Sequence, residues 1–210
     1  MSVILKASGG GSVTLQEPST TSDYTLSLPA TTGTMALTNN AGLSFVRITG
    51  GTLSGASAIT VDGCFTSTYK NYYIYVNTTH SSGGSDTDFY FQYRASGVTN
   101  GSSNYAYQTN YINAGLNAGT AVASIGDAGS FSIYDNLDNG GVFSGWFQIL
   151  NPQVTGETQS QWFLYGADNG YRKQMLGFGS QNQSTSFDGI NISMSGGNLT
   201  GTYDIYGVAR

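Results

Sequence analysis

The chain has 210 residues, of which only 9% are charged, and its formal net charge is −5 with seven lysines and arginines. Those cations are scattered, so no basic stripe exists to replace the counterions of a nucleic acid, and we expect no nucleic-acid partner. No stretch approaches the roughly 20 apolar residues that span a bilayer, and the first residues lack the basic and apolar regions of a signal peptide. We therefore expect that the protein does not insert into a membrane. We also expect that it is made in a cytoplasm.

The low charge is combined with many aromatic residues, which make up 13% of the chain, and with 30 glycines and 15 tyrosines. Ordinary globular proteins carry roughly 25% charged residues. Disordered chains are poor in aromatics, so disorder is not expected. Ser, Thr and Asn supply most polar positions, Thr and Tyr suit a pleated strand, and Gly suits turns. The composition therefore predicts an all-β protein with surfaces suited to protein or sugar.

The segment 12–37 contains three short runs of alternating apolar residues, separated by Pro18, Pro29 and Ser/Thr clusters. Such alternation predicts half-buried strands, and the interruptions predict turns. A ribbon of two or three short strands is marginal in water by itself. We therefore expect residues 1–54 to form an extended β-arm that docks on a particle or on sister chains. Its apolar face comprises Val13, Leu15, Tyr24, Leu26, Leu28, Met35 and Leu37.

The remaining residues, 55–210, are predicted to form one antiparallel β domain. Gly50, Gly51 and Gly55 suggest a linker before it. From residue 59 onward, strand-like segments recur at intervals of about 8 to 12 residues with Gly, Ser and Asn turns between them, which indicates a sandwich or barrel. With eight or more strands, a jelly-roll-like β-sandwich is the first expectation and an immunoglobulin-like sandwich the second.

The strongest predicted strand is the segment 68–76, in which Tyr72, Ile74 and Val76 share one face. After a glycine-rich polar stretch, the segment 88–94 alternates in the same way. Two such runs joined by a polar turn predict an antiparallel hairpin.

The segment 9–40, GGGSVTLQEPSTTSDYTLSLPATTGTMALTNN, resembles the start of many tailed-bacteriophage virion proteins of the fibre and head-decoration type. In those, an arm G-x-V-T-L-x-x-P is followed by Y-T-L-x-L-P-A-T-x-G-T. Later pieces are similar to the C-terminal β domain of such proteins, at Phe65, Tyr69, Tyr72, Arg94, Gly97, Gly201, Ile205, Tyr206 and Gly207. The resemblance implies a structural subunit on the outer surface of the virion, assembled as a homotrimer and made in the host cytoplasm.

Tyrosines occupy both faces of the segment 68–76, so one set must point away from the core. Outward aromatic rings suit a protein contact or stacking on a sugar. The candidate surface contacts are Tyr73, Tyr75, Tyr90, Trp146 and Trp162.

No catalytic residue is expected. His80 is the only histidine and lies in a glycine-rich stretch, where a Ser-His-Asp triad would lack a rigid base, so we expect an exposed loop histidine. Cys64 is expected to be a small buried hydrophobe. Glu17 and Glu157 are the only glutamates, and the aspartates are spread over separate turns. A glycosidase would need two converging carboxylates, and none are paired in the sequence.

Neither a metal nor a cofactor is expected. The loop 135–141 has Leu137 at the third position and Trp146 at the twelfth, where a calcium loop of the EF-hand type needs oxygen ligands. A looser site with Asp135 and Asp138 remains open beside the simpler interpretation, a polar hairpin turn.

Together these patterns predict a non-enzymatic structural component of a tailed-phage virion. The expected role is a capsid decoration or cement protein, a homotrimer bound to the major capsid protein or another virion protein. The alternative is a short tail or head fibre protein that binds host surface glycan. A surface carbohydrate-binding module and a hydrolase are rival classes.

Overall fold

The computed structural model describes residues 2–6, 12–16, 44–81, 86–113, 119–168 and 170–209. These residues form strands and turns, and no helix occurs among them. The pairings between their strands are antiparallel. The prediction of an all-β, antiparallel protein is therefore confirmed. The chain divides into two compact units, Met1–Asn40 and Ala41–Arg210.

The first unit contains a two-stranded ribbon. Its strands are β1 (Ser2–Lys6) and β2 (Ser12–Gln16), with Leu15 opposite Val3 and Val13 opposite Leu5. The strand expected around Val13 and Leu15 is thus present. The other expected arm residues lie outside the described part of the chain: Tyr24, Leu26, Leu28, Met35 and Leu37.

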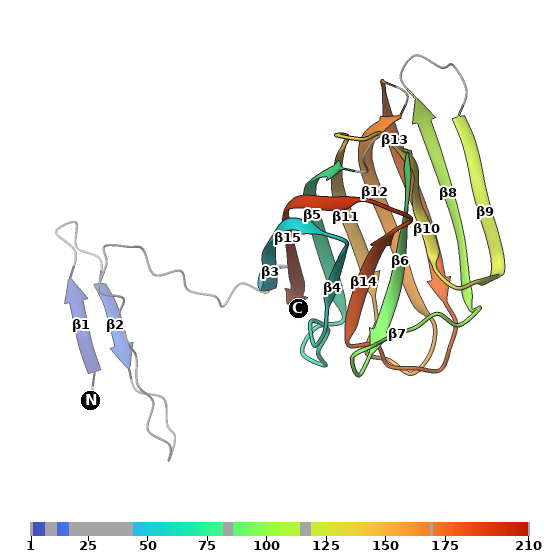
Figure 1. The fold of residues 1–210 in the computed structure, drawn as a ribbon. Coiled ribbons are helices and arrows are strands. Elements are labelled where there is room, and N and C mark those ends of the chain that lie inside the picture. Colours follow the sequence, from blue (N-terminus) through green and yellow to red (C-terminus); the bar gives the residue numbers. More distant parts are fainter. Residues whose placement is uncertain are drawn as a thin grey trace. The chain divides into compact units, whose positions relative to one another are not determined.

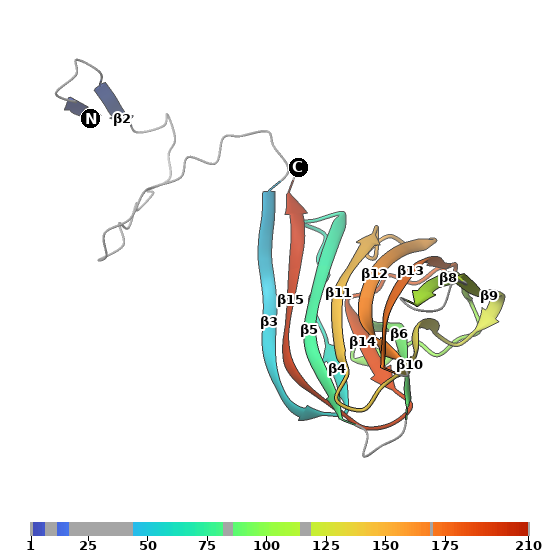
Figure 2. The ribbon, with the colours of Figure 1, turned by 90° about the horizontal axis from the view of Figure 1, so that it is seen from above.

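The second unit contains two sheets. The larger has eight strands and the smaller has five, and Figures 1 and 2 show the smaller lying against one face of the larger, which curves around it. In spatial order the larger sheet comprises β3 (Ser44–Ala56), β15 (Asn198–Ala209), β5 (Asn71–Ser81), β11 (Val142–Leu150), β12 (Thr158–Asp168), β13 (Tyr171–Gln181), β8 (Tyr105–Asn113) and β9 (Gly119–Ala128). The smaller comprises β10 (Phe131–Leu137), β6 (Thr87–Ala95), β14 (Gly189–Met194) and β4 (Ala58–Val61), with β7 (Val98–Thr99) paired to β6.

An aromatic core fills the space between the two sheets. Phe89 of β6 stacks on Phe143 of β11 with ring centroids 4.3 Å apart, and Phe91 stacks on Phe147 at 5.4 Å. Successive residues of a strand point to opposite faces, so each strand gives alternate residues to this core. Burial alternates along β5 and β6 as the sequence predicted. Stacked rings at these distances add to the gain from apolar burial.

The predicted hairpin between the segments 68–76 and 88–94 is wrong. β5 pairs with β11 and β15, whereas β6 pairs with β10 and β14 in the other sheet. Both strands turn an apolar face to the core, so they face each other across it: the ring of His80 on β5 packs edge-on against Phe89 on β6 at 5.7 Å. A polar connection is equally compatible with strands that pair and with strands that cross between sheets.

The division of the chain differs from the boundary expected at residue 54. That position lies inside β3, which pairs with β15 from Ser44 opposite Ala209 to Ala56 opposite Leu199. The glycines interpreted as a linker are strand residues, and Gly50 and Gly51 make room for β15 side chains. A Cβ atom on Gly51 would lie 2.9 Å from the ring of Tyr203.

Candidate functional site

The outer face of the eight-stranded sheet carries a cluster of aromatic rings over β3, β15, β5, β11 and β12. Tyr73 stacks with Tyr75 at 6.3 Å between centroids and lies 6.0 Å from Trp146. Phe45 meets Tyr73 edge-on at 5.1 Å. We call this cluster the aromatic patch: Phe45, Tyr73, Tyr75, Trp146, Phe163 and Tyr206.

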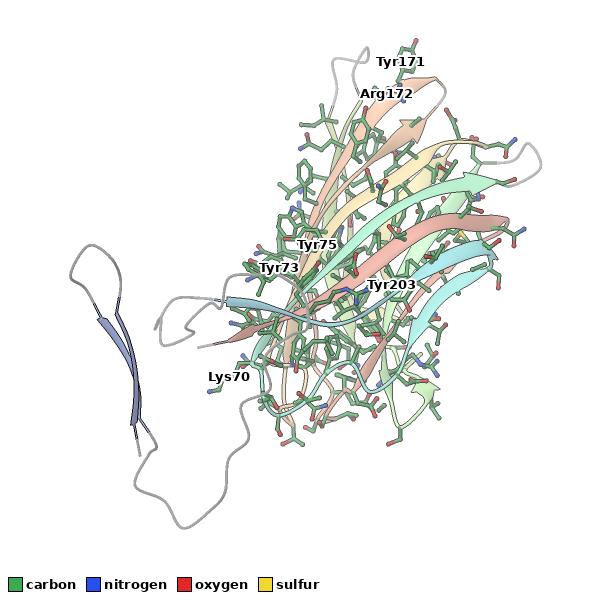
Figure 3. All side chains as sticks on the ribbon, turned by 90° about the vertical axis from the view of Figure 1, so that its left-hand side faces the viewer. Lys70, Tyr73, Tyr75, Tyr171, Arg172 and Tyr203 are labelled. Atoms are coloured by element: carbon green, nitrogen blue, oxygen red, sulfur yellow. The ribbon has the colours of Figure 1, made fainter. Side chains whose placement is uncertain are left out.

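Strand register brings these rings together. Trp146 lies opposite Tyr75 of β5 on one side and opposite Phe163 of β12 on the other. Side chains directly opposite each other on one face lie about 4.5 to 5.5 Å apart at Cβ. The three rings therefore form one row across three strands. Figure 3 shows Tyr73 and Tyr75 on the side of the sheet that faces away from the core.

The patch is open to solvent. Phe45 is 53% exposed and Tyr75 is 41% exposed, and with Tyr206 they line a depression of about 330 Å³. Rings held on paired strands lose little further freedom when they bind. A group of exposed rings on regular strands marks a contact surface.

Of the predicted contact aromatics, Tyr73, Tyr75 and Trp146 belong to the patch. Tyr90 does not, because it lies on β6 in the smaller sheet. Its side chain is half-buried, and its hydroxyl donates to Asp88 Oδ2 at 3.4 Å. Tyr90 therefore cannot share a ligand with the patch.

Trp162 is not a surface aromatic, and this prediction is wrong. Its side chain is fully buried and packs 5.4 Å from Phe131 of the smaller sheet. In the run Gln161 to Tyr165, apolar side chains occupy both faces of the strand. Sequence alternation alone does not say which of those faces meets the core.

Three patch residues were missed by sequence analysis as contacts: Phe45, Phe163 and Tyr206. Phe45 and Tyr206 are 161 positions apart in the numbering, and only the pairing of β3 with β15 joins them. Phe163 could have been found from the sequence, because it alternates with Tyr165 and a strand places both rings on one face of β12.

A second feature of the same outer face is a groove of about 650 Å³ over β8, β13, β12 and the end of β11. Phe178 lies in it and is 58% exposed. We call it the amide groove, because glutamines surround the ring. Its lining includes Gln108, Leu150, Glu157, Gln159, Gln161 and Phe178.

The amide groove is nearly uncharged. Among the lining residues that the structure describes, Glu157 carries the one formal charge and none is a lysine or arginine. Gln161 donates a hydrogen bond from Nε2 to Oε1 of Gln148 on the neighbouring strand. A site of exposed ring, amides and little charge can recognise a neutral ligand that has both apolar faces and hydroxyl groups.

His80 is not an exposed loop residue, so that prediction is wrong. β5 continues to Ser81, and the side chain of His80 is fully buried against Phe89. Its Nε2 lies 3.3 Å from the carbonyl oxygen of Gly196. The ring is part of the core, and its Nδ1 lies 3.5 Å from the carbonyl oxygen of Asp138, so both ring nitrogens face backbone carbonyls where a triad would have a carboxylate.

Cys64 is 1% exposed, which confirms its interpretation as a small buried residue. Removal from water penalises the thiolate, and this raises the pKa of the Cys64 thiol to about 12. The thiol at ordinary pH is therefore protonated and a poor nucleophile.

The aspartates of the 135–141 loop bond to separate partners. Asp135 Oδ1 accepts a hydrogen bond from Lys173 Nζ at 2.6 Å, and Asp138 Oδ2 accepts one from the backbone N–H of Gly170 at 3.0 Å. Among the described residues, no three His, Cys, Asp or Glu side chains gather as metal ligands.

Comparison of the chain with models of protein families, with curated proteins and with solved structures found no match. Within the described ranges, no helix has the length and apolar character needed to cross a bilayer. The aromatic patch and the amide groove are therefore the features on which a functional argument rests.

Proposed function

We propose that the protein is a non-enzymatic structural component of a tailed-phage virion. In this proposal it is a capsid decoration or cement protein, made in the host cytoplasm, that assembles as a homotrimer on the particle surface. It contacts the major capsid protein or another virion protein. The resemblance of residues 9–40 to virion proteins motivates the proposal.

The observation that carries the proposal is the exposed aromatic patch. It includes Phe45, which lies five residues beyond the end of the first unit at Asn40. Because this contact surface is so close in sequence to the arm, one assembly step can bury both the patch and the arm against partner chains. Burial of apolar surface supplies roughly 25 cal/mol per Å², so an interface of standard size provides ample association energy.

The architecture forms part of the proposal. We take the two facing sheets as a jelly-roll-like sandwich, because consecutive strands repeatedly change sheet. The chain passes from β5 to β6, from β9 to β10 and from β13 to β14 between the sheets, and returns after each. Such crossings favour this architecture over a simple meander.

The test is the position of the protein in an imaged particle together with its mass in solution. The proposal expects many copies spread over the capsid and a trimeric mass by light scattering. A chain that stays monomeric at all concentrations, or is missing from purified particles, would overturn it.

The second candidate is a short tail or head fibre protein that binds host surface glycan. The amide groove favours it, because an exposed ring among amides suits a sugar better than a capsid contact. Imaging separates the two candidates: a fibre would be found in few copies at the tail or at one vertex.

A further inference from the structure

One row of outward side chains crosses the sheet from the amide groove to the aromatic patch. In register, Gln108 of β8 lies opposite Phe178 of β13, which lies opposite Gln161 of β12. Gln161 lies opposite Gln148 of β11, which lies opposite Tyr73 of β5. Neighbouring strands are 4.7 to 4.9 Å apart, so the rings of Phe178 and Tyr73 are separated by roughly 14 Å along this row.

The row has hydrogen-bonding capacity between two rings. A primary amide has two N–H donors and a carbonyl acceptor. The bond from Gln161 Nε2 to Gln148 Oε1 uses one donor of the first and one lone pair of the second. It also fixes both amides in place, which lowers the entropy cost of binding. That bond does not use Gln161 Oε1 or the Gln148 amino group.

The charges of the chain and of the amide groove favour a neutral ligand. The chain has a net charge of −5, and the described lining of the groove contains Glu157 but no lysine or arginine. An anionic ligand would meet repulsion without a compensating Arg or Lys. A neutral ligand that alternates hydroxyl groups with C–H faces matches amides flanked by rings.

From these observations we infer that the row is the binding site of a neutral oligosaccharide. The sugar chain lies across β8, β13, β12 and β11 toward β5, with one unit stacked on Phe178 and another on Tyr73. Gln108, Gln161 and Gln148 bond to its hydroxyl groups. The inference rests on the second candidate function, glycan binding, and gives that function its site and ligand class.

A peptide fits the row less well. Extended peptides add to sheet edges through main-chain hydrogen bonds. The row instead lies on the face of the sheet, where the polar groups are side chains and the strands between β15 and β8 have both edges paired. The groove volume of about 650 Å³ is also within the range of small-molecule sites.

The test is calorimetric titration of the full chain with four neutral probes: maltohexaose, cellohexaose, mannohexaose and hexa-N-acetylchitohexaose. Polysialic acid serves as the anionic probe. The variants are Phe178→Ala and Gln161→Ala, both at exposed positions, so the core stays intact. Ile112→Ala is the matched control, because Ile112 is 60% exposed on the same face of β8 as Gln108.

We expect at least one neutral probe to bind, and Phe178→Ala to weaken that binding by about tenfold or more. Ile112→Ala should leave the affinity unchanged. Saturation-transfer NMR on the wild-type chain should place sugar protons against aromatic protons without any substitution. The inference is overturned if no neutral probe binds, if only polysialic acid binds, or if both variants bind as the wild type does. If the protein is a monomer and binds the sugar, the proposed role as a trimeric decoration protein is overturned, whereas the sugar-binding site is supported.

Discussion

The indole ring of Trp162 fills the space that a side chain on Gly177 would occupy. The two residues lie opposite each other on β12 and β13, and a Cβ atom on Gly177 would be 2.2 Å from Cε2 of Trp162. On its other side the indole packs against Phe131 of the smaller sheet. The tryptophan therefore depends on a strand glycine for its place between the sheets.

We predict that Gly177→Ala destabilises the protein by about 1 to 3 kcal/mol, the usual cost of overpacking a core. The indole has no room to retreat, because Phe131 confines it. Urea unfolding should show a lower midpoint with an unchanged slope. Gly156→Ala is the control, since a Cβ atom there would meet no atom within 4 Å. Equal midpoints for the two variants would contradict the packing argument.

Strand alternation could be predicted from the sequence because it is local. Tyr72, Ile74 and Val76 are buried as expected, and the same alternation places Tyr73 and Tyr75 on the opposite face. Strand partners could not be predicted in this way. The strand that follows β5 in the sequence, β6, lies in the other sheet and meets β5 only across the core, where His80 packs against Phe89. Local alternation does not reveal that contact.

The roles of Gly51 and Gly177 also could not be predicted from local sequence. Gly51 looks like a linker residue because the ring that needs its space, Tyr203, is far away in the sequence. Trp162 was wrongly predicted to be exposed for a related reason. Its strand has apolar residues on both faces, and the sequence does not show that Gly177 lies opposite Trp162. Tyr73, Tyr75 and Trp146 could each be chosen as contact aromatics from the sequence, but the register that places Trp146 opposite Tyr75 could not.

We predict that Phe45→Ser weakens self-association while leaving the stability of the domain nearly unchanged. Phe45 is 53% exposed, so its removal opens no cavity, but it takes a ring from the aromatic patch. Sedimentation velocity over a range of concentrations measures the effect. Val98→Ser is the control, because Val98 is 69% exposed on β7 of the smaller sheet. Identical association of Phe45→Ser and wild type would remove the patch from the assembly interface.

We predict a pH-dependent contribution from Asp62 and Arg94. The Arg94 guanidinium donates to both carboxylate oxygens, at 2.7 and 3.1 Å, and these bonds hold the pKa of Asp62 below its ordinary value of 3.8. Because the pKa is lower in the folded state, the stabilisation is complete above the unfolded pKa and is lost as the pH falls through the folded value.

Asp62→Asn should therefore lower the unfolding free energy at pH 7 by no more than about 1 kcal/mol, since the carboxylate is 47% exposed. At an acid pH below the folded pKa of Asp62, the variant and the wild type should be equally stable. Urea unfolding at both pH values measures this, with Asp86→Asn as a control acid at an exposed position. A gap between Asp62→Asn and wild type that persists at the acid pH would contradict the pKa argument.

The last prediction concerns Lys173, which is 1% exposed beside Asp135. Its Nζ donates to Asp135 Oδ1 at 2.6 Å and to the Asp135 carbonyl oxygen at 2.9 Å, and it lies 4.3 Å from the centre of the Tyr111 ring. Asp135→Asn removes the negative charge that accepts the 2.6 Å hydrogen bond from the buried ammonium, and the loss of this charged partner at a buried site should cost about 2 kcal/mol.

Replacing the lysine as well should recover most of that loss. Asp135→Asn combined with Lys173→Met removes the charge and keeps an unbranched side chain of similar length against Tyr111. Urea unfolding of both single variants and the double variant gives the coupling energy. Strictly additive losses would show that the ammonium does not depend on the Asp135 carboxylate.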